Sequence, residues 1–361
     1  MHRTQRARVG AAFALALAAA TAALPARAAD GVATGNTSGA SIAFSNSYAG
    51  NSFRQVMIKS FQQVAAQARK DHLINGYTVV SANNSVTEQA SQIENLILQG
   101  YKAIIVLAGS DTALNGAIRD ACNAGIVVVA FASGVTEPCA YRVDYNLDAY
   151  GKAEIDYLAS RFGSRPVNLL EIRGIAGDGF DKRLHAGVEK ALATHPNFKI
   201  VAQVYGQWTE TVAQQEVASI LPSLPRIDAV LTQGGDGYGA AMAFITAHRR
   251  LPVIIMGNRQ EELTLWSKLR AKSGYQTFSL GATPSVSQVA FWVAQQILAG
   301  KKVPKFVEVP LLTITQNDLA AWLAAIPPGG VANAQYPQAL VATIIDANIH
   351  HTALPSIPAP Q

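Results

Sequence analysis

Polar and aromatic side chains directly follow several apolar runs of this sequence, and their chemistry suits noncovalent recognition. The first group follows the run at 41–44 and comprises Ser45, Asn46, Ser47, Asn51, Phe53 and Arg54. Hydroxyl, amide and guanidinium groups exchange hydrogen bonds with a polar ligand, and an aromatic ring covers an apolar ligand face. Two alternatives stay open, because Asn51 also suits a helix N-cap and Phe53 also suits a core.

Similar side chains follow the later apolar runs. They are Ser110 and Asp111, then Ser133, then Lys182 and Arg183, and finally Trp208, Asp236, Asn258 and Arg259. Asp111 also suits a helix cap, and a solvent-facing helix surface is the alternative for Lys182 and Arg183. The neighbouring Gly234 and Gly235 leave the register of Asp236 open.

Catalytic chemistry finds no support in the residue pattern. A hydrolase needs a nucleophile, a base and an orienting group, yet the sequence has no G-x-S-x-G motif. The internal histidines His72, His185, His195 and His248 fall on predicted helices, where we expect them to face solvent. The glycine clusters match neither dinucleotide nor ATP motifs. We therefore expect a protein that is not an enzyme and that uses neither a cofactor nor a metal.

Short apolar runs alternate with longer amphipathic segments along the chain. The runs predicted as strands are 41–44, 77–81, 103–107, 126–131, 167–172, 199–204, 229–232, 253–256, 277–280 and 306–309. Runs such as AIIVLA are typical of strands buried on both faces, and the intervening segments have helical spacing. This alternation predicts an α/β fold with parallel sheets. At 361 residues, with 49% hydrophobic and 15% charged residues, two lobes are expected.

Five short motifs stand in the order and spacing of a known family. They are Asn51-Ser52-Phe53, Gly174-Ile175-Ala176-Gly177, the segment 228–240, Ile255-Met256-Gly257-Asn258 and Thr283-Pro284-Ser285. With these motifs, residues 41–325 resemble the type I periplasmic binding proteins, particularly the ribose-binding-like sugar-binding branch.

The resemblance implies two doubly wound parallel-sheet lobes joined by three hinge crossovers. It places residues 38–143 and 284–311 in an N-lobe and residues 144–283 and 312–330 in a C-lobe, with 331–361 as a C-terminal extension. The expected crossings lie near Asp144, at 282–284 and at 310–312. The ligand would lie between the lobes, at the carboxyl ends of the strands, as is general for open parallel sheets.

The resemblance also assigns roles to several candidate residues. Trp208 matches an aromatic residue that stacks on the sugar, while Lys182 and Arg183 fall where the family has a basic donor. Four positions depart from the pattern. Two of them are Arg54, which replaces an aromatic residue, and Asn258, which replaces an aspartate. Ala132 and Ser133 stand where relatives carry an Asp-Arg pair, so the solute specificity of relatives cannot be transferred.

The first 28 residues predict an export signal. Arg3, Arg6 and Arg8 precede an apolar stretch of about 16 residues, shorter than the roughly 20 residues of a membrane span, and Ala26-Arg27-Ala28 suits cleavage. This segment carries four arginines and no acidic residue, so its removal lowers the net charge from +5 to +1. We expect a periplasmic protein without nucleic-acid binding or stable membrane insertion.

The only two cysteines, Cys122 and Cys139, follow this signal. A disulfide between them is possible in an oxidising compartment, but sequence cannot give their separation.

The expected function is that of a monomeric periplasmic receptor that captures a small solute, a sugar or polyol, and delivers it to an ABC transporter permease. Two alternatives remain open within the same fold. One is a sensory receptor with a chemotaxis or kinase partner, and the other is a non-sugar ligand such as an autoinducer or purine.

Overall fold

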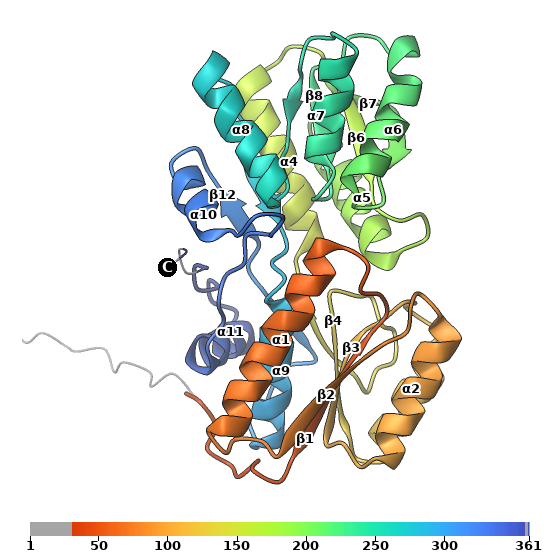
Figure 1. The fold of residues 1–361 in the computed structure, drawn as a ribbon, viewed down its shortest axis with the longest axis vertical. Helices are drawn as coiled ribbons and strands as arrows, with labels where there is room; N and C mark the ends of the chain where they lie inside the picture. Colours follow the sequence, from red (N-terminus) through yellow and green to blue (C-terminus); the bar gives the residue numbers. More distant parts are fainter. Residues whose placement is uncertain (1–30, 358–359, 361) are drawn as a thin grey trace, which may run out of the picture.

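The chain folds into two α/β lobes, one above the other in Figure 1. The computed structural model describes residues 31–357 and 360. The signal peptide predicted at 1–28 lies outside this range. Across the described residues, every helix is too short or too polar to cross a membrane.

The N-lobe is built on a parallel sheet with six strands among the described residues. Its order is β11 (Phe306–Glu308), β5 (Tyr141–Asp144), β4 (Val127–Phe131), β3 (Ala103–Leu107), β1 (Ser41–Asn46) and β2 (Gly76–Ser81). Helices α1 (Ser52–Lys70) and α9 (Val286–Leu298) cover one face, and α2 (Val86–Leu98) and α3 (Asn115–Asn123) cover the other. Because both faces are covered, all five residues of β3 are buried.

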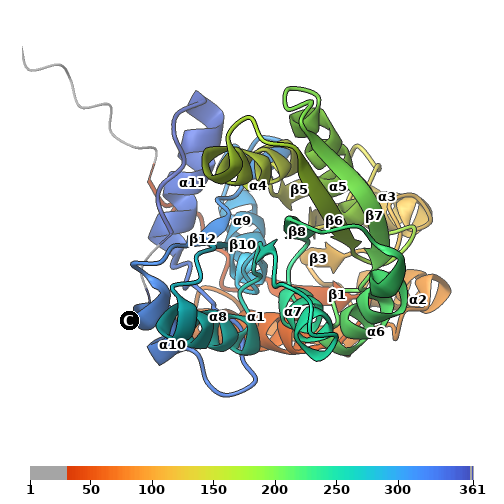
Figure 2. The ribbon, with the colours of Figure 1, turned by 90° about the horizontal axis from the view of Figure 1, so that it is seen from above.

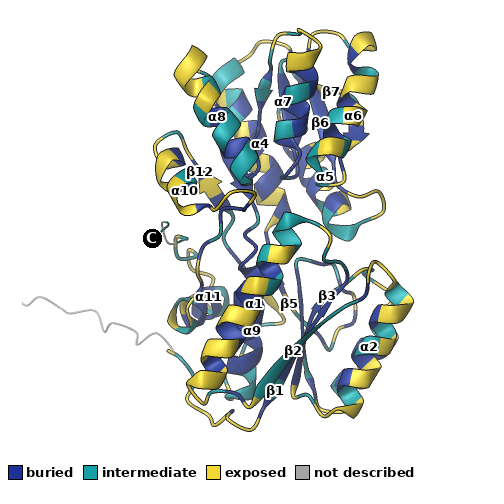
Figure 3. Ribbon diagram, in the orientation of Figure 1, coloured by how far each residue is buried: buried dark blue, intermediate teal, exposed yellow. Residues whose placement is uncertain are grey.

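The C-lobe is built on a second parallel sheet, which has the order β7 (Phe198–Tyr205), β6 (Val167–Arg173), β8 (Ala229–Thr232) and β9 (Val253–Ile254). Helices α4 (Leu147–Phe162) and α5 (Gly179–Leu192) pack together. So do α6 (Glu210–Ile220) and α7 (Gly237–Thr246), with α8 (Gln260–Ser273) beside α7. A short 3₁₀ turn, Leu221–Ser223, follows α6. In both lobes most helices bury one side and expose the other (Figure 3), whereas α9 is buried from Val286 to Gln296.

Each run predicted as a strand contains a strand of the structure, with bounds that differ by a few residues. Two strands were missed. The first is β5, and the second is β12 (Leu312–Ile314), which pairs antiparallel with β10 (Ser279–Gly281). The α/β fold is therefore confirmed, with one small antiparallel pair beside the parallel sheets.

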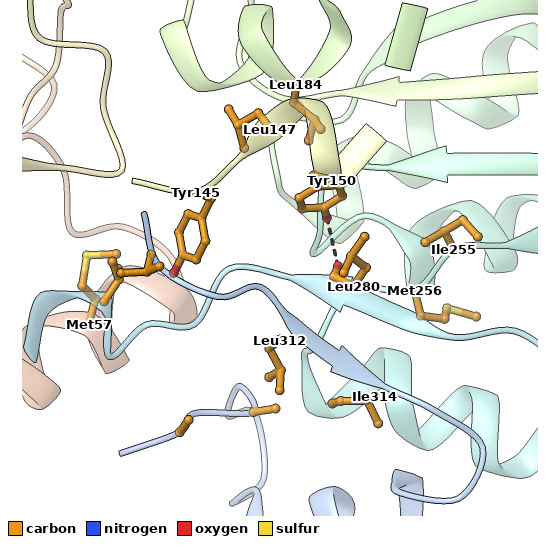
Figure 4. Close-up of a cluster of buried hydrophobic side chains, with 14 of the residues drawn as sticks. Met57, Tyr145, Leu147, Tyr150, Leu184, Ile255, Met256, Leu280, Leu312 and Ile314 are labelled. Carbon is orange, nitrogen blue, oxygen red and sulfur yellow. Dashed lines mark hydrogen bonds between the residues drawn. The ribbon is translucent and has the colours of Figure 1, made fainter. Parts of the chain in front are cut away.

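The chain passes between the lobes three times: between β5 and α4, between β10 and α9, and between β11 and β12. Buried side chains surround these hinge strands (Figure 4), and the Tyr150 hydroxyl donates to the Leu280 carbonyl (2.9 Å). Tyr145 joins the first two connections, because its hydroxyl accepts from the Thr283 N–H (3.1 Å) and donates to the Thr283 carbonyl (3.3 Å). The connections therefore form one packed unit.

The C-terminal segment adds a fourth link between the lobes. After α10 (Leu319–Ala325), Ala332 donates to the Asn258 carbonyl in the C-lobe (2.8 Å). The neighbouring Asn333 accepts from the Ser285 N–H (2.8 Å) and donates to Ser60 Oγ in the N-lobe (2.9 Å). Helix α11 (Gln338–His350) then packs on α9 (Figure 2). The linking segment, residues 330–336, is largely buried.

Cys122 and Cys139 form a disulfide, with their Cα atoms 6.3 Å apart. The bond joins the end of α3 to the loop after β4 and settles the alternative that the sequence left open.

Candidate ligand-binding site

A cleft of about 740 Å³, its open mouth included, lies between the lobes. The N-lobe and the hinge contribute Asn51, Phe53, Arg54, Met57, Leu107, Ala132, Gly281 and Ala282, and the C-lobe contributes Asp178, Phe180, Trp208, Gln233, Gly234, Gly235, Asn258 and Arg259. Six of the residues predicted from sequence are in this set: Asn51, Phe53, Arg54, Trp208, Asn258 and Arg259. They come from both lobes, so a ligand here contacts both.

Trp208 is held in a fixed position on the C-lobe wall of the cleft. Its backbone has a positive φ of 51°, and its ring lies so close to Gly174 that a Cβ atom there would come within 2.3 Å of it. The Phe180 ring meets Trp208 edge to face, with 6.3 Å between centroids. The Trp208 carbonyl also accepts from Arg259 Nη2 (2.7 Å). With Phe53 on the opposite lobe, the cleft has aromatic groups on both walls.

Asn51 both caps a helix and lines the cleft, the two roles that the sequence allowed. It is the N-cap of α1, where Oδ1 accepts from the Arg54 N–H (2.9 Å), and it also lines the cleft. Its side-chain amide group donates to no described residue, so it is available to a ligand oxygen.

Arg54 presents a guanidinium that lacks hydrogen-bond partners. Its Nη1 is buried and unpartnered among the described residues. Burial lowers the pKa of Arg54 to about 10, and the Asp178 carboxylate across the cleft partly offsets this effect. Arg54 therefore stays charged at neutral pH. A buried, unpaired cation is costly, so this group favours a ligand or water partner.

Asp178 faces Arg54 from the N-terminus of α5. Its Oδ1 accepts from the N–H groups of Phe180 (2.7 Å) and Asp181 (3.2 Å), as expected of an N-cap. Burial raises the pKa of Asp178, the capping bonds and Arg54 oppose this rise, and Asp111 adds to it. Because Asp178 lines the cleft, a polar ligand bound there can reach its carboxyl group.

A second hollow continues the cleft and is lined by four of the nine remaining predicted residues. Ser110, Asp111, Ser133 and Lys182 line it, together with Arg54. The alternative of Asp111 as a helix cap is wrong, because its Oδ1 accepts from the Gly134 N–H (3.0 Å) and the α3 N-terminus has no side-chain cap.

Five predicted residues line neither hollow. Ser45 and Asn46 end β1, which lies between β2 and β3, and Ser47 follows it; all three side chains are buried. Ser45 Oγ accepts from Gln89 Nε2 (3.2 Å), and Asn46 Nδ2 donates to the Tyr48 carbonyl (2.8 Å). These groups connect N-lobe elements to one another, which corrects the prediction that they face the ligand.

Arg183 and Asp236 are the other two. Arg183 Nη1 donates to Asp144 Oδ2 (2.6 Å) beside the first hinge connection, so its charge is paired within the protein. Asp236 is fully buried behind the cleft, where Oδ1 accepts from the Thr209 N–H (3.1 Å). Burial raises the pKa of Asp236 well above its ordinary value, and Glu262 adds to this rise.

Asn258 and Arg259 line the cleft, and their side chains also donate hydrogen bonds to backbone carbonyls. Asn258 Nδ2 donates to the Ala282 carbonyl at the hinge (2.8 Å), and Arg259 Nη1 donates to the Gly235 carbonyl (3.3 Å). Both therefore hold the loops in place, and only their remaining groups are available to a ligand.

Sequence reasoning missed several lining residues, among them Met57, Asp178, Phe180 and Gln233. Gln233 directly follows β8, and Asp178 and Phe180 lie shortly after β6, so their places after strand ends were a usable signal. Met57 gave none, because it lies one turn into α1 with the spacing of a core residue.

His185 contradicts the expectation that the helical histidines face solvent. Its Nδ1 lies 2.9 Å from Glu171 Oε1, and the ring is mostly buried. Burial raises the pKa of Glu171, and the bond to His185 opposes the rise. This pair lies outside both hollows. Within the part of the chain that the structure describes, no group of three or more metal-ligating side chains gathers.

Comparisons with known proteins agree with this geometry. The family model for the periplasmic binding protein domain matches residues 42–302. The xylitol-binding protein of Mycolicibacterium smegmatis is 32% identical over 178 residues, which is 48% of this chain and 51% of that protein. The ribose import binding protein of Haemophilus influenzae is 22% identical over 255 residues, covering 70% of this chain and 85% of that protein. The chain thus matches only about half the length of the first of these relatives.

Among solved structures, an ABC transporter solute binding protein from Thermobispora bispora superposes with a TM-score of 0.81. It is 33% identical, and the match covers 89% of this chain and 99% of that one. A solute binding protein from Actinobacillus succinogenes with bound D-allose has a TM-score of 0.66 at 21% identity, which indicates a shared fold.

Proposed function

We propose, from the premise that this chain belongs to the periplasmic binding protein family, that it captures a sugar or polyol between its lobes and delivers it to an ABC transporter permease. In this proposal the protein is a monomer of the periplasm that binds its solute without converting it. The named ligands of its relatives, xylitol and ribose, belong to the same hydroxyl-rich class.

The cleft carries the proposal. It combines aromatic rings from both lobes, Phe53 of the N-lobe with Phe180 and Trp208 of the C-lobe, with amide and guanidinium donors that have no partner among the described residues. A sugar offers an apolar C–H face to the rings and hydroxyl oxygens to the donors. Neither a purely apolar ligand nor a bare ion would use both kinds of group.

In this proposal, a permease recognises the closed state of the two lobes. We propose lobe boundaries of 38–143 with 284–311 for the N-lobe and 144–283 with 312–330 for the C-lobe. The connections between them move as hinges, and a ligand that contacts both lobes favours the closed state. Because the ligand bridges Arg54 on one lobe and Trp208 on the other, only the closed state provides all of its contacts.

Thermal unfolding of the mature protein tests this proposal. A ligand that binds only the folded form stabilises it by RT ln(1 + [L]/Kd), so one carbohydrate or polyol should raise the melting temperature in a dose-dependent way. The panel should pair pentoses, hexoses and alditols with purines, amino acids and autoinducers as controls. If a control solute stabilises the protein and no carbohydrate or polyol does, the proposed ligand class is wrong.

A further inference from the structure

The cleft continues past its aromatic part into the polar hollow described above. The two hollows share five lining residues: Arg54, Leu107, Ala132, Asp178 and Phe180. With their open mouths included, they measure about 740 and 790 Å³. The polar hollow therefore adds lining residues that the aromatic part of the cleft does not have.

The loop after β4 borders both hollows and carries small side chains there. Ala132, with a positive φ of 44°, lines both hollows, and Ser133 lines the polar one. The side chains of Ala132 and Ser133, a methyl and a hydroxymethyl group, occupy little of the space between the two hollows. Larger charged side chains at these two positions would fill the space between the hollows.

Several side-chain donors along the polar hollow have no acceptor among the described residues. Arg54 Nη1 is buried and has no partner among the described residues, and the Lys182 ammonium likewise contacts no described acceptor. The Ser110 and Ser133 hydroxyls accept from backbone N–H groups, at 3.2 Å from Ala113 and 3.5 Å from Ala108. Their own protons remain free to donate to a ligand.

The charges around the polar hollow balance. Arg54 and Lys182 are the cations of its lining, and Asp111 and Asp178 are the anions. An anionic ligand group would meet both carboxylates and a cationic group both cations, so neither gains a net attraction. Neutral hydroxyl groups can donate to the carboxylates and accept from the cations. The lining thus favours a neutral, hydroxyl-rich group.

We infer that the polar hollow is a second sugar subsite, and that this protein takes a neutral disaccharide or glycoside with one unit among the aromatic rings and the other beside Arg54, Lys182, Ser110 and Ser133. This inference rests on the proposed function and specifies its substrate class. The first unit then uses the contacts available to any monosaccharide, and the second adds the hydrogen bonds of the polar hollow.

Isothermal titration of the mature protein with matched pairs tests the inference: xylose with xylobiose, glucose with cellobiose and with maltose, and galactose with melibiose. At least one disaccharide should bind about tenfold tighter than its own monosaccharide, which corresponds to one or two additional neutral hydrogen bonds. Maltobionate, the acid counterpart of maltose, should bind no tighter than the neutral sugar.

Thr112→Trp provides the blocking variant, because Thr112 lines the polar hollow but not the aromatic part and is exposed enough to accept an indole. It should abolish the disaccharide advantage and leave monosaccharide affinity within about twofold. Ala113→Trp is the matched control, since Ala113 is the exposed neighbour that lines neither hollow.

The outcomes separate the two claims. If monosaccharides or alditols bind as tightly as every disaccharide, the second subsite is wrong and the proposed function stands. A disaccharide advantage that survives Thr112→Trp also contradicts the placement of the second unit. If no carbohydrate or polyol binds, the proposed function fails and the inference fails with it.

Discussion

The cleft and the hinge differ in how they use their polar groups. At the hinge, Tyr145 bonds twice to Thr283, and Asn333 bonds to both Ser285 and Ser60. In the cleft, Arg54 Nη1 is buried without a partner among the described residues, and the charge of Asp178 interacts with Arg54 across the cleft. The hinge is built for stability, whereas the cleft keeps binding capacity at some cost in stability.

The comparison teaches that polar residue type alone does not mark the ligand site. Ser45, Asn46 and Ser47 are as polar as the lining residues, but the N-lobe packs around them. If the contrast is correct, substitutions in the cleft should change binding, and substitutions at the hinge should change stability.

Trp208→Ala should produce the largest effect. Loss of the ring removes the apolar surface that covers a sugar face, so binding should weaken by about 1–3 kcal/mol. Titration of the identified solute measures this change, and Trp208→Phe should retain part of the affinity. Unchanged affinity in the alanine variant would remove Trp208 from the binding site.

Tyr145→Phe should act at the hinge instead. The variant leaves the buried Thr283 N–H without its acceptor, which should lower the free energy of unfolding by about 1–2 kcal/mol. Chemical denaturation measures this loss. Tyr141→Phe is the control, because the Tyr141 hydroxyl forms no hydrogen bond with a described residue. Equal stability of both variants would show that the Tyr145 hydroxyl does not join the connections.

Arg54→Met should raise the stability of the ligand-free protein and lower its affinity for the ligand. Removal of a buried, unpaired charge should stabilise the ligand-free protein by about 1 kcal/mol, while the ligand loses a donor and binds more weakly. Denaturation and titration of the same preparation measure both. Lys59→Met, at an exposed position of the same helix, should change neither. A destabilised Arg54→Met protein would indicate a structural role for the guanidinium.

Asp178→Asn should produce the smallest effect, visible in the pH profile. Burial raises the pKa of Asp178 above its ordinary value of 3.8, so the folded protein holds this proton at a pH where the unfolded chain has lost it. Stability of the ligand-free protein therefore falls as pH rises through this window. Asparagine keeps the helix cap without the titration, so the variant should lose part of this decline. A steeper decline in the variant would contradict the raised pKa.

The sequence predicted the lobes well because their strands carry their own signal. The run that forms β3 is apolar throughout and buried on both faces, so its fate depends little on distant contacts. Strand β5 was missed because its sequence, YRVD, is half polar, and it pairs with β11, more than 150 residues away along the chain. Long-range pairing of this kind leaves no local pattern.

The site was predicted less completely, because strand ends say where a residue lies but not which way it points. Trp208 and Arg54 were found in this way, whereas Ser45 and Asn46, at the end of the strand that precedes Arg54, are buried and line neither hollow. The pairing of His185 with Glu171 could not be foreseen either, since it joins a helix to a strand 14 positions away in sequence.

A crystal structure with the tightest-binding solute tests the central claim most directly. We predict electron density for the solute between Phe53 on the N-lobe and Trp208 on the C-lobe, with a ligand oxygen accepting a hydrogen bond from Arg54 Nη1. Density elsewhere on the protein, or a solute that contacts one lobe alone, would contradict the account.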